Sequence, residues 1–475
     1  MAAHPPQLEL AEYDDAGNIT ATYIETGPRI DVILPEERKT LLHQALDVFL
    51  PAGYPQSVTE DYMPFAGVGV GDASASPTAA LLLSVLQEST GRVATILFAA
   101  KLGTSLEPEC KAWRLAADFF NDAAMLLDCV SPALPRLPRV LVLSFSSILR
   151  ALCGVAAGSS KASLSAHFAR MQNLGELNAK DSSQETIISL LGMLAGSVVV
   201  SWVSSPLATW VAMLLLLTTH LGTNYAAVRA VSMRSLNRQR ANIVMTHLLA
   251  YDKILSPQQV SQRERIFELR DGALRWADDQ VIGRCRIGVR LAELVARLPG
   301  AEAGAPAAAR KTGAVVRDAG ASAKTMSLST LLKVFEHESY LLWFDSARSE
   351  ALIVLKQSCE PAAQLQAWTQ ALLLASRHGA AAGGRRGAAA TQTLGPQSAT
   401  SQQGLRQAAE QHGRVNEVET ELRLTLEQTR QMFGGGSGSA KKRLEAAGWD
   451  LSIAALETHP GTRAGVRASL WPEEK

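Results

Sequence analysis

The sequence predicts a mainly α-helical protein, with a helical domain embedded in a membrane and a small α/β module towards the C-terminus. Three observations predict this. The 43 residues from Thr186 to Val228 contain no Asp, Glu, Lys or Arg. Long apolar or amphipathic segments precede them, which is typical of helices. Two runs rich in β-branched and aromatic residues, 340–344 and 351–355, indicate a strand pair near the C-terminus.

The uncharged stretch is long enough for two membrane crossings, since one crossing takes about 20 residues. Ser204, Ser205 and Pro206 stand at its middle and offer an N-cap followed by a proline at the first helical position. We therefore expect a helical hairpin, 187–203 and 207–228. The alternative is a soluble bundle that buries this stretch at its centre.

Basic residues follow the hairpin at once, whereas the turn between its two helices has no charge. Excess positive charge stays on the cytoplasmic side of a membrane. Both ends of the hairpin and the C-terminal module are therefore expected to be cytoplasmic. The basic residues are Arg229, Arg234, Arg238 and Arg240.

The remaining elements are read from periodicity, caps and breakers. They form a polar leader and short helix (1–48, with a strand at 19–24 and a helix at 35–49), the helical domain (49–255), a helical segment and Ala/Gly-rich linker (256–325), and the α/β module (326–475). Within the helical domain we expect helices at 79–100, 111–130 and 140–158, then a polar connector at 161–185. After it we expect helices at 258–274 and 287–298. The module has helices at 362–376 and 415–433, a last strand at 451–456, and low-complexity inserts at about 379–404 and 434–439.

Composition excludes several classes of function. Lys plus Arg (46) nearly equals Asp plus Glu (45), so no net field attracts nucleic acid. Five cysteines lack the spacing of a zinc site or a disulfide framework. Gly67 to Gly71 lacks the third glycine of a dinucleotide loop, because Asp72 stands there. No hydrolase or metalloprotease motif is present, and no metal or cofactor site is evident.

Two groups of polar residues are the candidate site. Arg114, Asp118 and Asp122 are four residues apart and share one helix face. That face is either solvated, with an ordinary ion pair, or a polar site inside the helical bundle, where charge is costly. The second group precedes the hairpin, and is either helix-start chemistry, with a capping box from Ser182 to Glu185, or a polar site at the membrane surface. The candidates are Trp113, Arg114, Asp118, Asn121, Asp122, Lys180, Asp181, Gln184 and Glu185.

Three pairs of glycines have the Gly-x-x-x-Gly spacing. In an apolar helix this spacing makes a flat strip that lets two helix backbones approach closely. We expect these glycines to serve helix packing. The pairs are Gly67 and Gly71, Gly154 and Gly158, and Gly192 and Gly196.

Four runs of residues are more specific than any of these motifs. They read FLPAGYPQSV at 49–58, GVGVGDA at 67–73, WRLAADFFND at 113–122 and AKDSSQET at 179–186. In order and type they resemble the root UVB sensitive family over roughly Phe49 to Leu255. The C-terminal module resembles the family through 338–342 and 445–449. Two features depart from it: a helix-length segment is missing between Phe65 and Ala66, through a gene-model error or a true omission, and the Ala/Gly-rich inserts are additional.

The resemblance implies a membrane-associated protein without a catalytic activity, connected with UV-B responses, early seedling development, vitamin B6 homeostasis and pairing between family members. The leading hypothesis is therefore a membrane adaptor or regulator that pairs with a relative or with itself. The alternative is a carrier of a small polar metabolite, which would use Arg114, Asp118, Asn121, Asp122 and Arg150. An enzyme is the least supported reading. Membrane lipid and a family member are the expected partners, and nucleic acid is not.

Overall fold

The computed structural model divides the chain into two compact units. The helical unit comprises Gly67–Arg234 with Arg265–Phe267, and the α/β unit comprises Met1–Ala66, Ser235–Glu264 and Glu268–Lys475. The structure describes residues 8–14, 17, 19–26, 29–34, 79–203, 205–268, 271–298, 327–383, 417–436, 438–458 and 461–466. The predicted helix at 35–49, the pair Gly67 and Gly71, the linker and the Phe65–Ala66 junction lie outside these residues.

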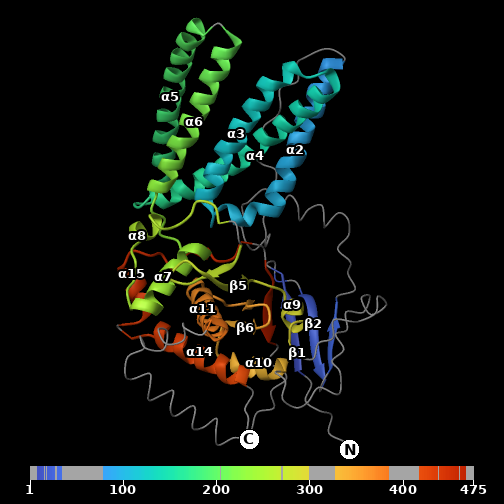
Figure 1. Ribbon diagram of the computed structural model, residues 1–475. Coiled ribbons are helices and arrows are strands. Elements are labelled where there is room, and N and C mark those ends of the chain that lie inside the picture. Colours follow the sequence, from blue (N-terminus) through green and yellow to red (C-terminus); the bar gives the residue numbers. More distant parts are fainter. Residues whose placement is uncertain are drawn as a thin grey trace, which may run out of the picture. The chain divides into compact units, whose positions relative to one another are not determined.

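The described part of the helical unit is built of long helices (Figure 1). α3 packs along α4, and α2 packs on another part of α4. The helices expected at 79–100, 111–130 and 140–158 are all confirmed, and the first and third are longer than predicted. The elements are α2 (Ala79–Leu106), α3 (Cys110–Val130), the 3₁₀ turn η1 (Ser131–Ala133), α4 (Arg136–Phe168), α5 (Leu174–Trp202) and α6 (Pro206–Ala230).

The predicted hairpin is confirmed as α5 and α6. The Ser205 hydroxyl caps α6 by accepting a hydrogen bond from the Ala208 amide at 3.2 Å, and Pro206 occupies the first helical position. Both helices, together with α4, are long and apolar enough to cross a membrane.

The predicted polar connector and capping box are wrong. Residues 161–168 end α4, and α5 begins at Leu174, so Ser182 lies in a helix interior, where its carbonyl accepts from the Thr186 hydroxyl at 2.9 Å. The physical reason is that Leu, Glu, Ala and Lys, which dominate the start of α5, are good helix formers despite their polarity. A polar stretch was mistaken for an irregular one.

The predicted glycine packing is not seen within the described chain. A side chain at Gly154, Gly158, Gly192 or Gly196 would meet nothing within 4 Å. The close approach occurs instead at Gly91 of α2, where a Cβ would lie 3.1 Å from the Ser147 hydroxyl of α4. Packing of the other glycines against a second chain stays a prediction.

The α/β unit has an eight-stranded sheet in the order β3-β2-β1-β8-β7-β5-β4, with β6 paired to β7. β7 runs antiparallel to β6, and its other edge is shared by parallel β5 and parallel β8. The predicted strand pair is confirmed as β6 and β7. The strands are β1 (Leu8–Tyr13), β2 (Ile19–Thr26), β3 (Arg29–Ile33), β4 (Ala273–Arg275), β5 (Val281–Ile287), β6 (Tyr340–Asp345), β7 (Glu350–Lys356) and β8 (Arg463–Val466).

The sheet corrects the expectation of a small C-terminal module. β1 to β3 come from the N-terminal leader, where only the strand at 19–24 was expected, and β1 joins β8 at the other end of the chain. α7 also belongs to this unit rather than to the helical one. The helices are α7 (Arg238–Tyr251), α8 (Pro257–Ser261), α9 (Leu291–Val295), α10 (Leu328–Val334), α11 (Pro361–Gly383), α14 (Glu417–Phe433) and α15 (Ala440–Ala446).

Two predicted helices of this unit are confirmed and three other elements are wrong. α11 and α14 match the expected helices at 362–376 and 415–433. The segment 258–274 contains only the short α8 and the start of β4, and 287–298 contains the end of β5 and the short α9. Residues 451–456 form no strand. Local patterns of apolar and polar residues favour a helix or a strand only weakly in such segments, and tertiary contacts decide between them.

Buried polar contacts join α7 to the rest of the α/β unit. The indole of Trp368, fully buried on α11, donates to the Asn242 side chain at 2.8 Å, and Asn242 donates to the Ala273 carbonyl of β4. Arg240 and Glu264 form an ion pair at 2.8 Å, with only 1% and 4% of these residues exposed. Burial makes this pair costly to break, because the remaining charge would lose its partner and stay away from water.

We predict that Glu264→Gln lowers the free energy of unfolding of the α/β unit by about 3–5 kcal/mol, because it strands the Arg240 guanidinium. Chemical denaturation followed by tryptophan fluorescence measures this. The control is Glu419→Gln, which removes the partner of the exposed Arg423 and should cost less than about 1 kcal/mol. Equal losses in the two variants would contradict the prediction.

Candidate functional site

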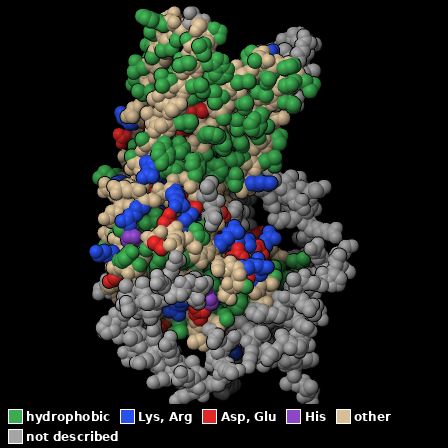
Figure 2. All heavy atoms as spheres, viewed as in Figure 1, with side chains coloured by type: hydrophobic (Ala, Val, Ile, Leu, Met, Phe, Trp, Pro, Cys, Tyr) green, Lys and Arg blue, Asp and Glu red, His purple; other side chains and the backbone are tan. Residues whose placement is uncertain are grey.

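The α5–α6 hairpin presents large apolar side chains to its surroundings. α5 buries none of its 29 residues, and α6 buries only Val228. Leu191, Leu207 and Leu215 are 55%, 76% and 66% exposed. Figure 2 shows hydrophobic side chains covering much of the visible face of both helices. This apolar surface needs a nonaqueous cover, because soluble proteins rarely expose so large a patch.

A polar pair lies between two helices of the same unit. Asp122 of α3 is only 3% exposed, and its Oδ2 lies 3.0 Å from Nδ1 of His220 on α6. The two residues are 98 positions apart in the sequence. His220 is the only histidine in the uncharged stretch from Thr186 to Val228. Packing of α3 against α6 therefore converts two isolated polar residues into a pair.

Around this pair, two carboxylate oxygens have no hydrogen-bond partner among the described residues. They are Oδ2 of Asp118, one turn before Asp122 on α3, and Oδ1 of Asp122 itself. Arg114 and His220 lie close enough to Asp118 to interact with it electrostatically, and Cys153 of α4 is near both acids. Buried acceptors without donors cost free energy. The cluster can therefore accept a proton, a cation or a donor group from a ligand.

The structure brings together part of the first predicted group. Arg114, Asp118 and Asp122 share the face that meets α6, as their spacing indicated. Trp113 instead packs its ring edge-on against Phe98 of α2, with the centroids 5.2 Å apart. Asn121 is half-buried. We therefore assign Trp113 to helix packing.

The second predicted group lies on α5 and forms a different contact. Asp181 and Glu185 accept from Lys161 of α4, at 2.8 and 2.7 Å, and all three side chains are about a third exposed or more. Lys180 and Gln184 are exposed. Partly exposed ion pairs contribute little stability, so this cluster ties α4 to α5 without forming an enclosed site.

Sequence reasoning missed three members of these clusters. They are His220, Lys161 and Cys153. Arg150 was named for a carrier, and it pairs with Asp128 of α3. The spacing of charges within one helix revealed the α3 face, but no local signal indicates which residue of another helix will oppose it.

The arginines after the hairpin divide into two pairs with different surroundings. Arg229 belongs to the last turn of α6. Arg238 pairs with Asp271 and donates to the Leu456 carbonyl at 2.8 Å, and Arg240 pairs with Glu264; both are buried in the α/β unit. The charge argument for a cytoplasmic exit therefore rests on Arg229 and Arg234 alone, and the orientation stays a prediction.

Two of the cysteines of the α/β unit are unsuited to nucleophilic chemistry. Burial raises the pKa of the Cys359 thiol to about 12. Burial also raises the pKa of the Cys285 thiol on β5. Since the thiolate is the reactive form, both stay protonated and unreactive at neutral pH.

We predict that Asp122→Leu leaves the midpoint of thermal unfolding of the helical unit unchanged or raises it. Leucine removes a buried carboxylate whose Oδ1 lacks a partner, and the His220 side chain that it leaves is 41% exposed and can turn to other partners. Thermal unfolding of the detergent-solubilised chain measures this. The control Leu115→Ala, at a position 7% exposed on the same helix, should cost about 2–5 kcal/mol. A loss at Asp122 as large as at Leu115 would assign the carboxylate a structural role.

Comparisons with known proteins match most of the chain. Residues 35–67 and 64–252 match the sequence model of a family described as "Vitamin B6 photo-protection and homoeostasis domain". Residues 313–459 match a second, described as "Root UVB sensitive protein, C-terminal". The first match divides at residues 64–67, the place where sequence analysis found a segment missing. No solved structure matches.

Individual relatives cover about half of the chain. Protein root UVB sensitive 3 of Arabidopsis thaliana is 34% identical over 276 residues, which is 53% of this chain and 62% of that protein. RUS family member 1 of Dictyostelium discoideum is 32% identical over 286 residues, 54% of each. Protein root UVB sensitive 2, chloroplastic, of Arabidopsis thaliana is 25% identical over 256 residues, 50% of this chain and 59% of that protein. The matched part thus spans less than two thirds of these relatives.

Proposed function

The chain belongs to the root UVB sensitive family, and we propose that it is a non-enzymatic membrane protein that acts in vitamin B6 homeostasis and the UV-B response by pairing with family members. In this proposal the helical unit is the membrane anchor and the pairing surface, and the α/β unit is a cytoplasmic docking module. The family descriptions support the connection with vitamin B6. The sequence supports the non-enzymatic part, since it contains no catalytic motif.

The observation that carries the membrane proposal is that α5 has no buried residue. A helix whose sides are apolar and unburied is stable in hydrocarbon, where its backbone hydrogen bonds are satisfied internally. α6 has 25 residues, which at 1.5 Å per residue exceeds the hydrocarbon thickness of about 30 Å. Water would instead solvate the whole apolar surface at a large free-energy cost.

The glycines of α5 support pairing. Gly192 and Gly196 are one turn apart on the apolar part of the helix. A side chain placed at either position would meet no other atom within 4 Å. Such a strip lets a second helix approach closely, and dispersion contacts then stabilise the pair in lipid. A family member, or a second copy of this chain, is the occupant we propose.

We predict that the full chain stays in the membrane pellet after carbonate extraction. Leu194→Arg and Leu215→Arg, at positions 59% and 66% exposed, should move part of it to the supernatant, because an arginine at the centre of a span costs about 2.5–3.5 kcal/mol. The control Leu174→Arg makes the same change at the polar start of α5 and should stay in the pellet. If carbonate moved the unaltered chain into the supernatant, the result would support a soluble bundle instead.

We predict that Gly192→Leu and Gly196→Leu together reduce the recovery of one tagged copy with another, or with a coexpressed relative, from detergent extracts. The bulky side chains hold the two helices apart. The control is Gly175→Leu, on the same helix but before the uncharged stretch, where a side chain also meets nothing within 4 Å. Equal recovery from all variants would argue against this strip as the pairing surface.

A second candidate function, a carrier of a small polar metabolite, is favoured by the Asp118, Asp122 and His220 cluster. Ionisable residues inside membrane helices are costly and usually mark a pathway or a binding site. An adaptor has no need of buried, unpartnered carboxylate oxygens. The exposed pairs on Lys161 and Arg150, by contrast, are ordinary surface ion pairs and suit either function.

For a carrier, vesicles that contain the purified chain should take up B6 vitamers faster than empty vesicles, and Asp122→Asn should abolish the difference. Asparagine keeps the shape of the side chain and removes its charge. The control Asp181→Asn removes a carboxylate from the exposed Lys161 cluster and should leave uptake unchanged. Uptake equal to that of empty vesicles would eliminate the carrier for these solutes and leave the pairing proposal intact.

A further inference from the structure

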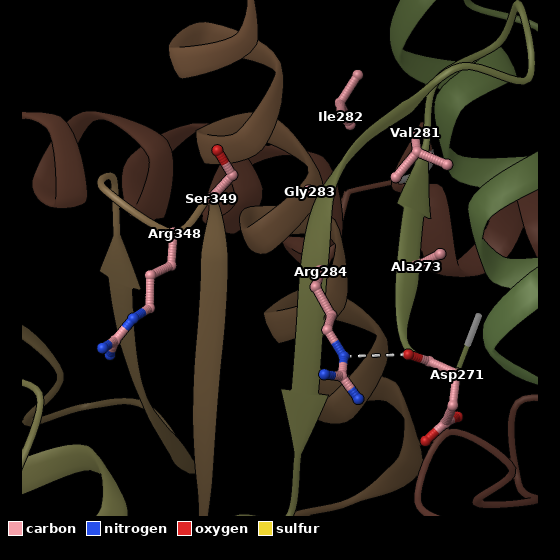
Figure 3. Close-up of a pocket in the computed structure, with 8 residues that line it drawn as sticks. All are labelled: Asp271, Ala273, Val281, Ile282, Gly283, Arg284, Arg348 and Ser349. Carbon is pink, nitrogen blue, oxygen red and sulfur yellow. Dashed lines mark hydrogen bonds between the residues drawn. The ribbon is translucent and has the colours of Figure 1, made fainter.

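A cavity of about 730 Å³ opens on the α/β unit between β4, β5 and the turn that joins β6 to β7 (Figure 3). Its volume falls in the range of sites for small molecules, roughly 300–1,000 Å³. It lies in the sheet of the α/β unit and shares no residue with the polar cluster of the helical unit. Neither function proposed above uses it.

Two arginines line this cavity, one from a strand and one from a turn. Arg284 projects from β5 and Arg348 from the β6–β7 turn, and in Figure 3 both side chains extend in the same direction along the sheet. Nε of Arg284 donates to the Asp271 backbone carbonyl at 3.2 Å, and no carboxylate among the described residues lies within 4 Å of its guanidinium. Its terminal amino groups are therefore available to an anion.

Arg348 is also weakly committed to its acidic neighbour. Its side chain is 59% exposed, and Nη1 lies 3.7 Å from Oδ2 of Asp345, beyond hydrogen-bond distance. The same Asp345 oxygen is closer to Arg297, at 3.3 Å, and its other oxygen accepts from the Ala347 amide at 3.1 Å. Asp345 is thus satisfied by other groups, which leaves the Arg348 charge largely uncompensated.

The acid in the cavity lining does not cancel these charges. The carboxylate of Asp271 forms an ion pair with Arg238, whose side chain is 9% exposed in the unit's interior. Arg238 therefore neutralises Asp271. The charge left facing the open space is that of Arg284 and Arg348, so the cavity attracts anions.

The rest of the lining includes aliphatic side chains and a glycine. Val281, Ile282 and Ala273 supply aliphatic surface. At Gly283 a Cβ would lie 2.7 Å from the Ser349 carbonyl oxygen, so this position excludes a side chain while β5 approaches the β6–β7 turn. Figure 3 shows Val281 and Ile282 toward one end of the cavity and both arginine side chains extending toward the other, an arrangement that suits a ligand with an apolar body and one anionic group.

We propose that this cavity binds a small organic anion: an apolar ring or short chain that carries one phosphate or carboxylate. Arg284 holds the anionic group by charge-assisted hydrogen bonds, for which a guanidinium is well shaped, and the positive charge of Arg348 across β7 adds to the attraction. The apolar body packs against Val281 and Ile282. The site is distinct from the membrane helices, so it provides the α/β unit with a means of sensing or carrying a soluble metabolite.

The test uses the full chain in detergent and isothermal titration calorimetry with phenyl phosphate, benzoate, phenol and inorganic phosphate. Phenyl phosphate or benzoate should bind more tightly than phenol, which lacks the anion, and than inorganic phosphate, which lacks the apolar body. Arg284→Gln should weaken that binding about tenfold or more, and Arg348→Gln should weaken it by less. Both arginines are exposed at the surface, so circular dichroism should show an unchanged fold.

The matched control is Arg423→Gln, which removes an exposed arginine of α14 that pairs with Glu419. It should bind the anion as the unaltered chain does. The proposal is overturned if none of the probes binds, if phenol binds as tightly as phenyl phosphate, or if all three arginine variants lose affinity equally. Displacement of phenyl phosphate by vesicles of phosphatidic acid, but not by excess benzoate, would replace the soluble anion with a lipid headgroup.

Discussion

The helical unit depends on one constraint: α5 buries none of its residues, so its apolar surface must be covered by something outside the described chain. Hydrocarbon is the cover that we propose for the apolar part of this helix. With such a cover, α5 and α6 do not need to bury apolar side chains against each other to be stable. The cover also explains why glycines that meet no neighbour in the chain are compatible with the fold, since a lipid chain or a second helix can fill the space beside them.

Against that apolar background, the polar residues of the unit separate by their surroundings. Lys161 with Asp181 and Glu185, and Arg150 with Asp128, form exposed pairs whose loss costs little. Asp118 and Asp122 are different, because each keeps a buried oxygen without a described partner beside His220. Natural proteins keep such costly groups where function requires them. The acid and histidine cluster is therefore the strongest candidate for chemistry inside the helical unit, whichever of the two proposed functions is correct.

The α/β unit is organised around β7, whose two edges pair with three strands. Through β8 the sheet continues to strands from the beginning of the chain, and α7 is joined to it by Trp368, Asn242 and the buried Arg240–Glu264 pair. Two of the arginines that follow the hairpin, Arg238 and Arg240, are thus part of the core of this unit. The same sheet leaves Arg284 and Arg348 at its surface. Burial therefore distinguishes these two arginines from Arg238 and Arg240.

The sequence by itself determined the features that depend on neighbouring residues. The uncharged stretch with Ser205 and Pro206 at its middle defines the hairpin, and the spacing of Arg114, Asp118 and Asp122 defines one helix face, because helix periodicity and capping are local. Only the tertiary structure decided the rest: that His220 meets Asp122, that strands from both ends of the chain share one sheet, and that 258–274 is not a helix. Each of these depends on a partner distant in sequence, and local patterns carry no information about which distant partner a residue will meet.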